Sequence, residues 1–489
     1  MNAALLVVAV LFGAALTGAA LGFRSLPRRR PYGKAPDGDG PFLFPAGFLW
    51  GAATSDQQIE HQQPSDWTDL ENRAASAHMN ATSPTGAPLP GHIKGIVDVR
   101  PDVLRKKADF DRLYAEDLGR AASMGHNAHR FSMSWARLYP REDQRFPDPA
   151  GIDFYGRILD EHKRAGLVPF VTLHHFAIPA WLARESGGRR GVERADAVAH
   201  FQRFADEMAR TFGDRVHFWC TINEPMVYAY QGYLDGTFPP NEQREGPKAV
   251  TPVRDALLMM HAAAYRAIHD DAKRRRSNAS VGFAQHVRAF MPWRDLNPLD
   301  RFTANAIDKM FITDFIDGAR GLMDYVGVNF YGRSYVKTKL TDPTHFEILH
   351  HDQNDPNEDQ SDLGWAADEE ALTDTLARFH ERYGLPQYVL ENGTADSAID
   401  DARRQRGLVR HTQAIWRAVQ HHHADVRGYF HWSLIDNFEW AEGFGPRFGL
   451  YAVDYERDFA RTPRKSVDVY KQIASHNALP AALWRRFRR

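Results

Sequence analysis

The chain of 489 residues contains one cysteine, Cys220, so an intrachain disulfide is excluded. We interpret Cys220 as a small buried packing residue, because it stands inside an apolar strand pattern. A predominant charge is also missing: 61 Lys and Arg oppose 62 Asp and Glu, for a formal net charge of −1, so no nucleic-acid partner is indicated. The first strand pattern lacks the glycine-rich turn of a dinucleotide-binding fold, since Gly51 is followed by Ala52, Ala53 and Thr54. These absences argue against a disulfide scaffold and against an open, doubly wound nucleotide-binding sheet.

Long apolar runs are missing except at the N-terminus, where residues 3–23 are apolar apart from Thr17 and glycines. This length is close to the about 20 residues that span a bilayer. No basic residue precedes the run, and five follow it: Arg24, Arg28, Arg29, Arg30 and Lys34. A cleaved signal peptide carries its positive charge before the apolar run, so we predict an uncleaved membrane anchor at 1–23. The positive-inside rule then places the globular domain in the cytoplasm.

The alternative for this segment is a signal that is cleaved, which would make the protein secreted. The small residues 18–20 leave such cleavage possible. Residues 24–41 follow as a linker, of which 31–41 are rich in Pro, Gly and Asp and show no periodicity. The anchor, if present, would therefore be joined to the globular domain by an irregular connection.

Between residues 42 and 478, strand patterns alternate with amphipathic helix patterns. The predicted strands are 48–53, 127–132, 168–173, 218–223, 281–285, 325–329, 388–390 and 428–432. The predicted helices include 103–124, 154–165, 195–212, 253–273, 369–383 and 407–422. Eight strands, each followed by a helix or a long loop, predict an α/β fold, a single (β/α)8 TIM barrel.

Three further segments carry no barrel pattern. The stretches 72–97 and 338–365 are the longest irregular ones, and in a barrel enzyme such insertions usually lie on the active-site face. Residues 479–489 are basic and aromatic. We predict a frayed, solvated tail there, with contact to a membrane surface as the alternative.

Two glutamates each stand at the end of a predicted strand. Glu224 follows the apolar run 218–222 and Asn223, and Glu391 follows the run 388–390. A carboxylate at a strand's end faces the loops rather than the core. Two such carboxylates from different strands are what cleavage of a glycosidic bond needs, because one protonates the leaving oxygen and the other attacks the anomeric carbon. The alternative is a pair of buried glutamates that serve as structural anchors.

Other polar and aromatic residues also follow the predicted strands, and a barrel brings all its strand ends to one rim. They are Gln58, Glu60, Arg130, His174, His175, Asn223, Asn329, Tyr331, Trp432, Glu439 and Trp440. The adjacent histidines are not expected to hold a metal, because neighbouring residues of a strand point to opposite faces and no third ligand is evident. The sequence therefore predicts one site built from segments that lie far apart in the chain.

From about residue 42 to 473 the chain closely resembles glycoside hydrolase family 1, the β-glucosidase and β-galactosidase family. Residues 48–55 are similar to the family's opening signature and residues 130–135 to its second-strand motif. Residues 223–225 resemble its acid/base motif, residues 391–393 its nucleophile motif, and residues 432–440 its eighth-strand block. The resemblance implies an O-glycosyl hydrolase on a (β/α)8 barrel.

The resemblance assigns a role to each rim residue. Glu391 would be the nucleophile that forms a glycosyl-enzyme intermediate, and Glu224 the general acid and then the base for water, with the two carboxyl groups ~5–5.5 Å apart and net retention. Arg130, Asn329 and Tyr331 would orient the nucleophile. Asn223 would donate to the sugar 2-hydroxyl. The outer hydroxyls would be bound by Gln58, His175, Glu439 and Trp440, and Trp432 would stack on the sugar ring. No metal or organic cofactor is required.

The chain departs from the family's pattern beside the sugar-binding residues. His61 replaces the usual glycine after Glu60, and Phe176-Ala177 replaces the usual tryptophan and aspartate, so the sugar is not fixed. Glu439 would repel a phosphate, which disfavours 6-phosphorylated sugars.

We predict a retaining β-glycosidase that removes terminal, non-reducing β-D-glucosyl, galactosyl or fucosyl units from a carbohydrate substrate. One alternative, suggested by the anchor and the basic tail, is a membrane-associated transglycosylase acting on glycolipids. Another is a non-catalytic sugar-binding protein, which would have lost one of the two glutamates.

Overall fold

The computed structural model describes residues 38–76, 99–339, 342–351 and 359–488. The predicted anchor at 1–23 and most of the predicted linker lie outside these residues, so both stay predictions. In the described part of the chain, no helix combines the length and the apolar character needed to cross a bilayer.

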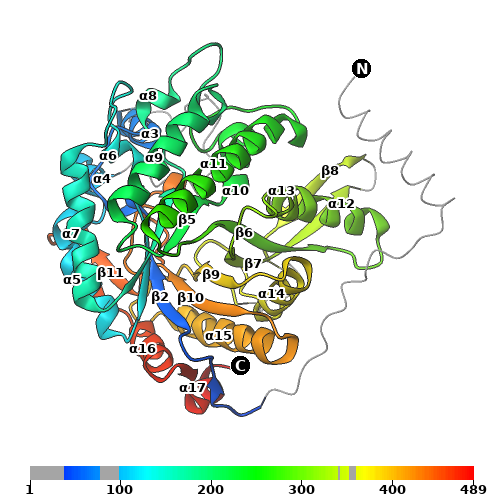
Figure 1. Ribbon diagram of the computed structural model, residues 1–489. Helices are drawn as coiled ribbons and strands as arrows, with labels where there is room; N and C mark the ends of the chain where they lie inside the picture. The colour runs from blue at the N-terminus through cyan, green and yellow to red at the C-terminus, as the bar shows by residue number, and fades with distance from the viewer. Residues whose placement is uncertain (1–37, 77–98, 340–341, 352–358, 489) are drawn as a thin grey trace.

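Eight parallel strands close into a barrel at the centre of the molecule (Figure 1). They are β2 (Leu49–Ala53), β3 (Ala128–Ser132), β4 (Val168–His174), β5 (Phe218–Asn223), β6 (Ser280–Pro292), β7 (Val326–Lys339), β9 (Gln387–Asn392) and β10 (Val426–Trp432). Neighbours follow the chain order, and β10 returns to pair with β2. Each strand overlaps one of the eight predicted from the sequence, so the predicted (β/α)8 barrel is confirmed.

Large apolar side chains fill the interior of the barrel. The rings of Phe170, Tyr325, Tyr388 and Phe430 lie 5.3–5.6 Å apart in edge-to-face contacts. Cys220 is buried in the same cluster, in agreement with its interpretation as a packing residue. Because the strands are covered on both faces, they read as nearly continuous apolar runs, and polar residues are left for their carboxyl ends.

Helices surround the barrel (Figure 1). The long ones are α5 (Phe110–Ser123), α7 (Pro149–Ala165), α9 (Ala197–Phe212), α11 (Thr251–Arg275), α14 (Glu369–Tyr383) and α15 (Ala402–His422). Shorter ones are α2 (Asp56–Ile59), α3 (Asp66–Ser76), α4 (Pro101–Lys106), α6 (Trp135–Leu138), α8 (Ala180–Ala183), α10 (Pro225–Tyr233), α12 (Pro298–Asp308), α13 (Asp314–Gly318) and α16 (Ser466–His476). Local signals set their ends: Asp148 caps α7 by accepting the amides of Ala150 and Gly151, and Gly166 ends it at φ +69°.

The helix predicted at 103–124 is divided into α4 and α5. Lys107 and Asp109 between them have φ values of +56° and +55°, which no α-helix can contain. The Nζ atom of Lys107 lies 2.5 Å from the Oε2 atom of Glu71, and both side chains are fully buried. The helical pattern of apolar residues continues through residues 107–109. The chain nevertheless forms two helices, because Lys107 turns away to pair with Glu71.

The predicted irregular stretch at 338–365 contains a strand. It is β8 (Asp342–Leu349), which pairs antiparallel with the outer part of β7 and lies at the side of the molecule near α12 (Figure 1). The prediction failed there because β6 and β7 continue beyond the barrel, where they gain a partner that only the folded chain provides. The other stretch, 72–97, begins within α3, and its larger part falls outside the described residues.

The C-terminal segment packs on the domain, so the prediction of a frayed tail is wrong over the described residues. The strand β13 (Ala478–Leu479) pairs with β1 (Phe42–Leu43), and the helix α17 (Ala481–Phe487) follows it. Leu483, Trp484 and Phe487 are buried, and the Trp484 ring lies 5.6 Å from that of Phe42. The aromatic residues of the C-terminal segment therefore pack against the beginning of the domain at Phe42. A last hairpin, β11 (Tyr451–Asp454) with β12 (Ala460–Pro463), stands apart from the barrel sheet.

Candidate active site

Glu224 and Glu391 lie at the carboxyl ends of β5 and β9, as the sequence predicts. Their side chains are only 8% and 5% exposed. Glu224 has a left-handed backbone, with φ +45°, and it is held there by its amide, which donates to the Ala284 carbonyl at 2.7 Å, and by Pro225, which starts α10. Such a conformation is uncommon for a residue with a side chain and concentrates at functional sites.

Both oxygens of Glu391 accept hydrogen bonds from residues of other strands. Arg130 Nη1 donates to Oε1 at 2.5 Å, and Tyr331 Oη donates to Oε2 at 2.9 Å. Arg130 is itself fixed by its donations to the Leu390 carbonyl and to Thr172 Oγ1, each at 3.2 Å. One full positive charge and two directed donors thus stabilise a negative charge on Glu391.

Glu224 is surrounded by a different set of groups. Its Oε1 atom accepts a hydrogen bond from Asn329 Nδ2 at 2.8 Å and lies 3.1 Å from His286 Nδ1. The prediction placed Asn329 beside the nucleophile candidate, whereas its amide donates to Glu224 and to Asn223.

Asn223 connects the surroundings of the two glutamates. Its Oδ1 atom accepts hydrogen bonds from Arg130 Nη2 at 2.6 Å and from Asn329 Nδ2 at 3.0 Å. Its Nδ2 atom is therefore the donor toward His175 Nε2, 3.1 Å away. Burial and the charge of Arg130 hold the pKa of His175 well below its usual range, so the ring is neutral and carries its proton on Nδ1.

The remaining predicted residues gather beside His175. Its ring is nearly parallel to those of Trp432 and Trp440, at centroid distances of 6.0 and 5.8 Å. Gln58 Nε2 donates to the Phe438 carbonyl at 2.8 Å and lies 3.5 Å from Glu439 Oε2. Gln58 Oε1 is buried and has no hydrogen-bond partner within the described ranges, so it can accept from a hydroxyl group.

The two departures from the family's pattern lie close to this group. Phe176, at φ +66°, packs its ring 5.0 Å from that of Trp440 and 5.4 Å from that of Phe238. His61 points elsewhere, since its Nε2 atom lies 2.7 Å from Asp109 Oδ1. The Phe176 ring thus takes the place of the usual tryptophan next to Trp440, and this is the departure that can change the choice of sugar.

The buried carboxyl groups of Glu391 and Glu439 have raised pKa values. Burial raises the pKa of Glu391 to about 7; Arg130 opposes this rise, and the charge of Glu224 adds to it. Burial, reinforced by the charge of Glu391, raises the pKa of Glu439 to about 8. Burial also holds the pKa of Tyr331 well above its usual range, so this hydroxyl stays a donor.

Sequence reasoning missed His286 and Arg288. Both lie on β6, whose predicted strand ended at residue 285, and His286 is the next residue in the chain. The signal for His286 was available, because this polar residue directly follows the predicted strand 281–285. His286 contacts Glu224, and its ring is stacked on that of Tyr331 at 5.8 Å.

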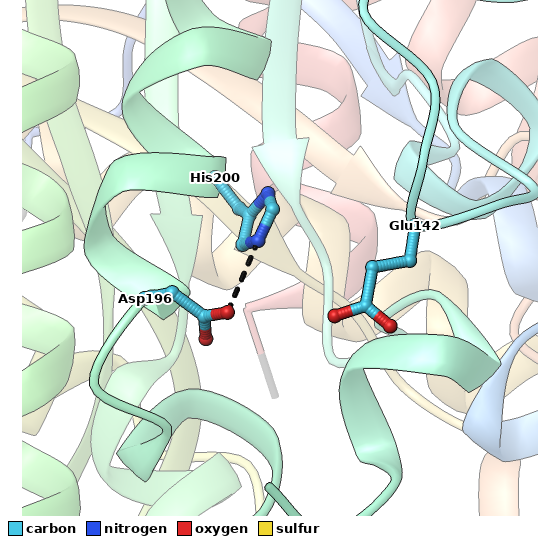
Figure 2. A group of neighbouring side chains, drawn as sticks. All are labelled: Glu142, Asp196 and His200. Carbon is cyan, nitrogen blue, oxygen red and sulfur yellow. Dashed lines mark ion pairs between the residues drawn. The ribbon is translucent and has the colours of Figure 1, made fainter.

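A separate cluster has the composition of a metal site. One ligand atom from each of Glu142, Asp196 and His200 lies within 4.8 Å of the others (Figure 2). The Nη2 atom of Arg194, however, lies 2.5 Å from Glu142 and 2.8 Å from Asp196. A cation therefore already occupies the place between these carboxylates, and the cluster is an ion-pair network that ties the loop after α6 to the start of α9.

Comparison with known proteins gives one consistent result. The family model described as Glycosyl hydrolase family 1 matches residues 41–319 and 298–479. The chain is 30% identical over 479 residues to the bifunctional β-D-glucosidase/β-D-fucosidase of Bifidobacterium breve, which covers 89% of this chain and 99% of that protein. It is also 30% identical over 473 residues to β-glucosidase A of Thermotoga maritima, with 89% and 98% covered.

Solved structures agree with these sequences. The β-glycosidase from Pyrococcus horikoshii has a TM-score of 0.78 and 32% identity, covering 92% of this chain and 98% of that chain. A mutant of a rice β-glucosidase in a covalent complex with glucose has a TM-score of 0.75 and 26% identity, with 88% and 98% covered.

Proposed function

Because this chain belongs to glycosyl hydrolase family 1 and is a glycosyl hydrolase, we propose that it is a retaining β-glycosidase acting on terminal, non-reducing β-D-glucosyl, galactosyl or fucosyl units. The observation that carries the proposal is the unequal support of the two glutamates. Glu391 is held by a cation and a hydroxyl, whereas Glu224 receives a hydrogen bond from the neutral amide of Asn329.

This difference assigns the two roles. A negative charge is better stabilised on Glu391, which suits a nucleophile, and the role of proton donor therefore belongs to Glu224. Because Glu224 Oε1 accepts a hydrogen bond from Asn329, the acidic proton belongs on Oε2. One glutamate is thereby prepared as a nucleophile and the other as an acid.

In the first step Glu391 attacks the anomeric carbon, while the bond from that carbon to the leaving oxygen breaks and Glu224 transfers its proton to this oxygen. The product is a glycosyl ester of Glu391 with inverted configuration. In the second step Glu224, now a carboxylate, removes a proton from water as the water oxygen attacks the anomeric carbon and the ester bond breaks. Two inversions give net retention and restore both glutamates.

The names of the relatives support the sugar class. The Bifidobacterium breve protein is named for both glucosidase and fucosidase activity, and the rice β-glucosidase mutant carries glucose covalently. Gln58, His175, Glu439 and Trp440 would bind the outer hydroxyls, and Trp432 would support the ring from below. Transfer to a glycolipid, the alternative, was suggested by the anchor, which lies outside the described residues, and by the tail, which packs on the domain.

The experiment that tests the proposal is hydrolysis of nitrophenyl β-glucoside, β-galactoside and β-fucoside, with the anomer of the released sugar followed by proton NMR. We expect hydrolysis of at least one substrate and first appearance of the β-anomer. First appearance of the α-anomer would contradict a retaining mechanism. No hydrolysis of any of the three by folded protein would contradict the glycosidase proposal for these sugars.

Replacing Tyr331 by phenylalanine is expected to move the acidic limb of the pH–rate profile to higher pH. The hydrogen bond from Tyr331 lowers the pKa of Glu391, so its removal raises that pKa, and Glu391 then becomes ionised only at higher pH. A shift of up to about one unit is expected for one neutral donor. The measurement is kcat/KM against pH with a nitrophenyl substrate.

The matched control for this variant is Tyr265→Phe. Tyr265 Oη also donates to a carboxylate, Asp324 Oδ1 at 2.9 Å, at the start of β7 and away from the two glutamates. Its profile should coincide with that of the wild type. An acidic limb that stays in place, or moves to lower pH, in Tyr331→Phe would show that Glu391 does not set it.

A further inference from the structure

The outer part of β6 carries Arg288 beyond the level of the two glutamates. The Ala284 carbonyl accepts the Glu224 amide, so Arg288 stands four residues, about 13 Å of strand, further from the barrel. The pairing of β6 with β7 is irregular between Val287 and Ala289. An irregularity of this kind re-aims the side chain that it contains, and here this side chain is Arg288.

The guanidinium of Arg288 is buried without a negative partner in the described part of the chain. The residue is 5% exposed, and its Nη2 atom has no hydrogen-bond partner within the described ranges. Its Nη1 atom lies 3.4 Å from both Ser334 Oγ and His350 Nδ1, and neither group carries a negative charge. The guanidinium lies over the ring of Trp365, 4.4 Å from the centroid, which fixes its plane.

Other buried arginines of this chain have the negative partner that Arg288 lacks among the described residues. Arg404 lies 2.7 Å from Asp401, and Arg464 lies 2.9 Å from Asp436. A buried charge without a partner is unfavourable, because desolvation is not offset by an opposite charge. Burial accordingly lowers the pKa of Arg288 to about 10, a value at which the group is still charged at neutral pH. The structure thus keeps a buried cation whose negative partner is missing among the described residues.

The position of Arg288 indicates which part of the substrate it meets. Arg288 lies on β6 two residues beyond His286, whose Nδ1 atom lies 3.1 Å from Glu224 Oε1. Glu224 donates its proton to the leaving oxygen in the proposed mechanism, so the leaving group lies on the Glu224 side. Gln58, by contrast, approaches Glu439 and belongs to the group of residues beside His175 and Trp440.

We propose that Arg288 binds a carboxylate on the leaving group, and that the preferred substrates are therefore β-glycosides of acidic aglycones. This inference rests on the proposed function. A single guanidinium balances a single negative charge, and its planar fork matches a carboxylate through two parallel hydrogen bonds. The buried, unpartnered Nη2 atom and the fixed plane over Trp365 suit a carboxylate better than a doubly charged phosphate.

The test compares acidic and neutral leaving groups of the same shape. The substrates are ortho-, meta- and para-carboxyphenyl β-glycosides and their methyl esters, with the sugar that the enzyme hydrolyses fastest. The readout is the ratio of kcat/KM for acid to kcat/KM for ester. In the wild type this ratio should be about ten- to a hundredfold higher than in Arg288→Gln for at least one isomer. Arg288→Lys should keep part of the preference, because it keeps the charge without the fork.

The matched control is Lys337→Gln, which removes the same charge from the neighbouring strand. Lys337 is 41% exposed and is paired with Glu347 at 3.7 Å. It should leave the ratio at the wild-type value. Since Arg288 has no acidic partner among the described residues, its replacement leaves no carboxylate unpaired, and Arg288→Gln should fold; circular dichroism and thermal unfolding check this.

A binding measurement decides the matter independently of turnover. Calorimetry with carboxyphenyl thio-β-glycosides and their esters should show tighter binding of the acid by wild type and Lys337→Gln, and loss of this difference in Arg288→Gln. Equal ratios and equal binding in all three proteins would overturn the inference while ester hydrolysis keeps the proposed function intact. If no ester is hydrolysed, the proposed function fails, and the calorimetric difference still supports or refutes a carboxylate site at Arg288.

Discussion

Replacing Glu391 by alanine is expected to lower kcat/KM by at least about 10⁴-fold, and added azide is expected to restore turnover. Loss of a catalytic nucleophile typically has effects of this size or larger, because no other group can form the covalent intermediate. The shortened side chain leaves space beside Arg130 and Tyr331, the two donors that hold the carboxylate. Azide can enter this space and attack from the same face, so the product should be the α-glycosyl azide.

The control for this variant is Glu60→Ala. Glu60 is also a buried glutamate at the barrel rim, and its Oε2 atom lies 3.0 Å from Arg137. Its loss leaves a largely buried arginine without one of its carboxylates, as the loss of Glu391 does, and so has a comparable effect on stability. Azide should not raise the activity of Glu60→Ala. A Glu391→Ala protein that keeps activity, or that yields a β-glycosyl azide, would contradict the assignment of the nucleophile.

Replacing Glu224 by alanine is expected to reduce activity by an amount that depends on the leaving group. General acid catalysis contributes about 10²–10⁴-fold, and it matters most when the departing oxygen is strongly basic. Alkyl β-glycosides should therefore lose about 10⁴-fold in kcat/KM, whereas dinitrophenyl β-glycosides should lose far less. Since Glu391 still forms the intermediate, azide should intercept it from the other face and give the β-glycosyl azide.

The comparison variant is Glu224→Gln, which has the same shape and can keep the hydrogen bond from Asn329. It should show the same dependence on the leaving group, which separates the missing proton from a displaced side chain. The measurement is a plot of log(kcat/KM) against leaving-group pKa for wild type and both variants. A slope equal to that of the wild type would show that Glu224 is not the proton donor.

The position of the two glutamates follows from the local sequence, whereas their different roles depend on residues that lie far away in the chain. The apolar runs before Glu224 and Glu391 place both residues at strand ends, and the structure agrees. Which carboxylate is ionised depends on Arg130, Tyr331 and Asn329, of which Arg130 is 261 positions from Glu391 in the sequence. The resemblance places Arg130, Tyr331 and Asn329 beside Glu391. In the structure Arg130 and Tyr331 donate to Glu391, whereas the amide of Asn329 donates to Glu224.

The differences between prediction and structure share this cause. Lys107 interrupts a continuous helical pattern because it reaches Glu71, and the basic tail is ordered because Trp484 packs on Phe42. His286 and Arg288 were missed because β6 continues past the rim, where β7 supplies its partner. In each case the contact that determines the structure joins residues far apart in the sequence. No local pattern of apolar residues could have predicted it.

The sequence by itself determined the alternation of eight strands with helices, and with it the barrel and the rim position of Glu224 and Glu391. These features follow from local hydrophobic periodicity, which is strong wherever a strand is buried on both faces. Only the tertiary structure decided that the Asn329 amide meets Glu224 and that Arg288 is left without a negative partner among the described residues. Hydrogen bonds and burial of charge depend on distances of a few ångström between remote segments, and these distances are set only when the barrel closes.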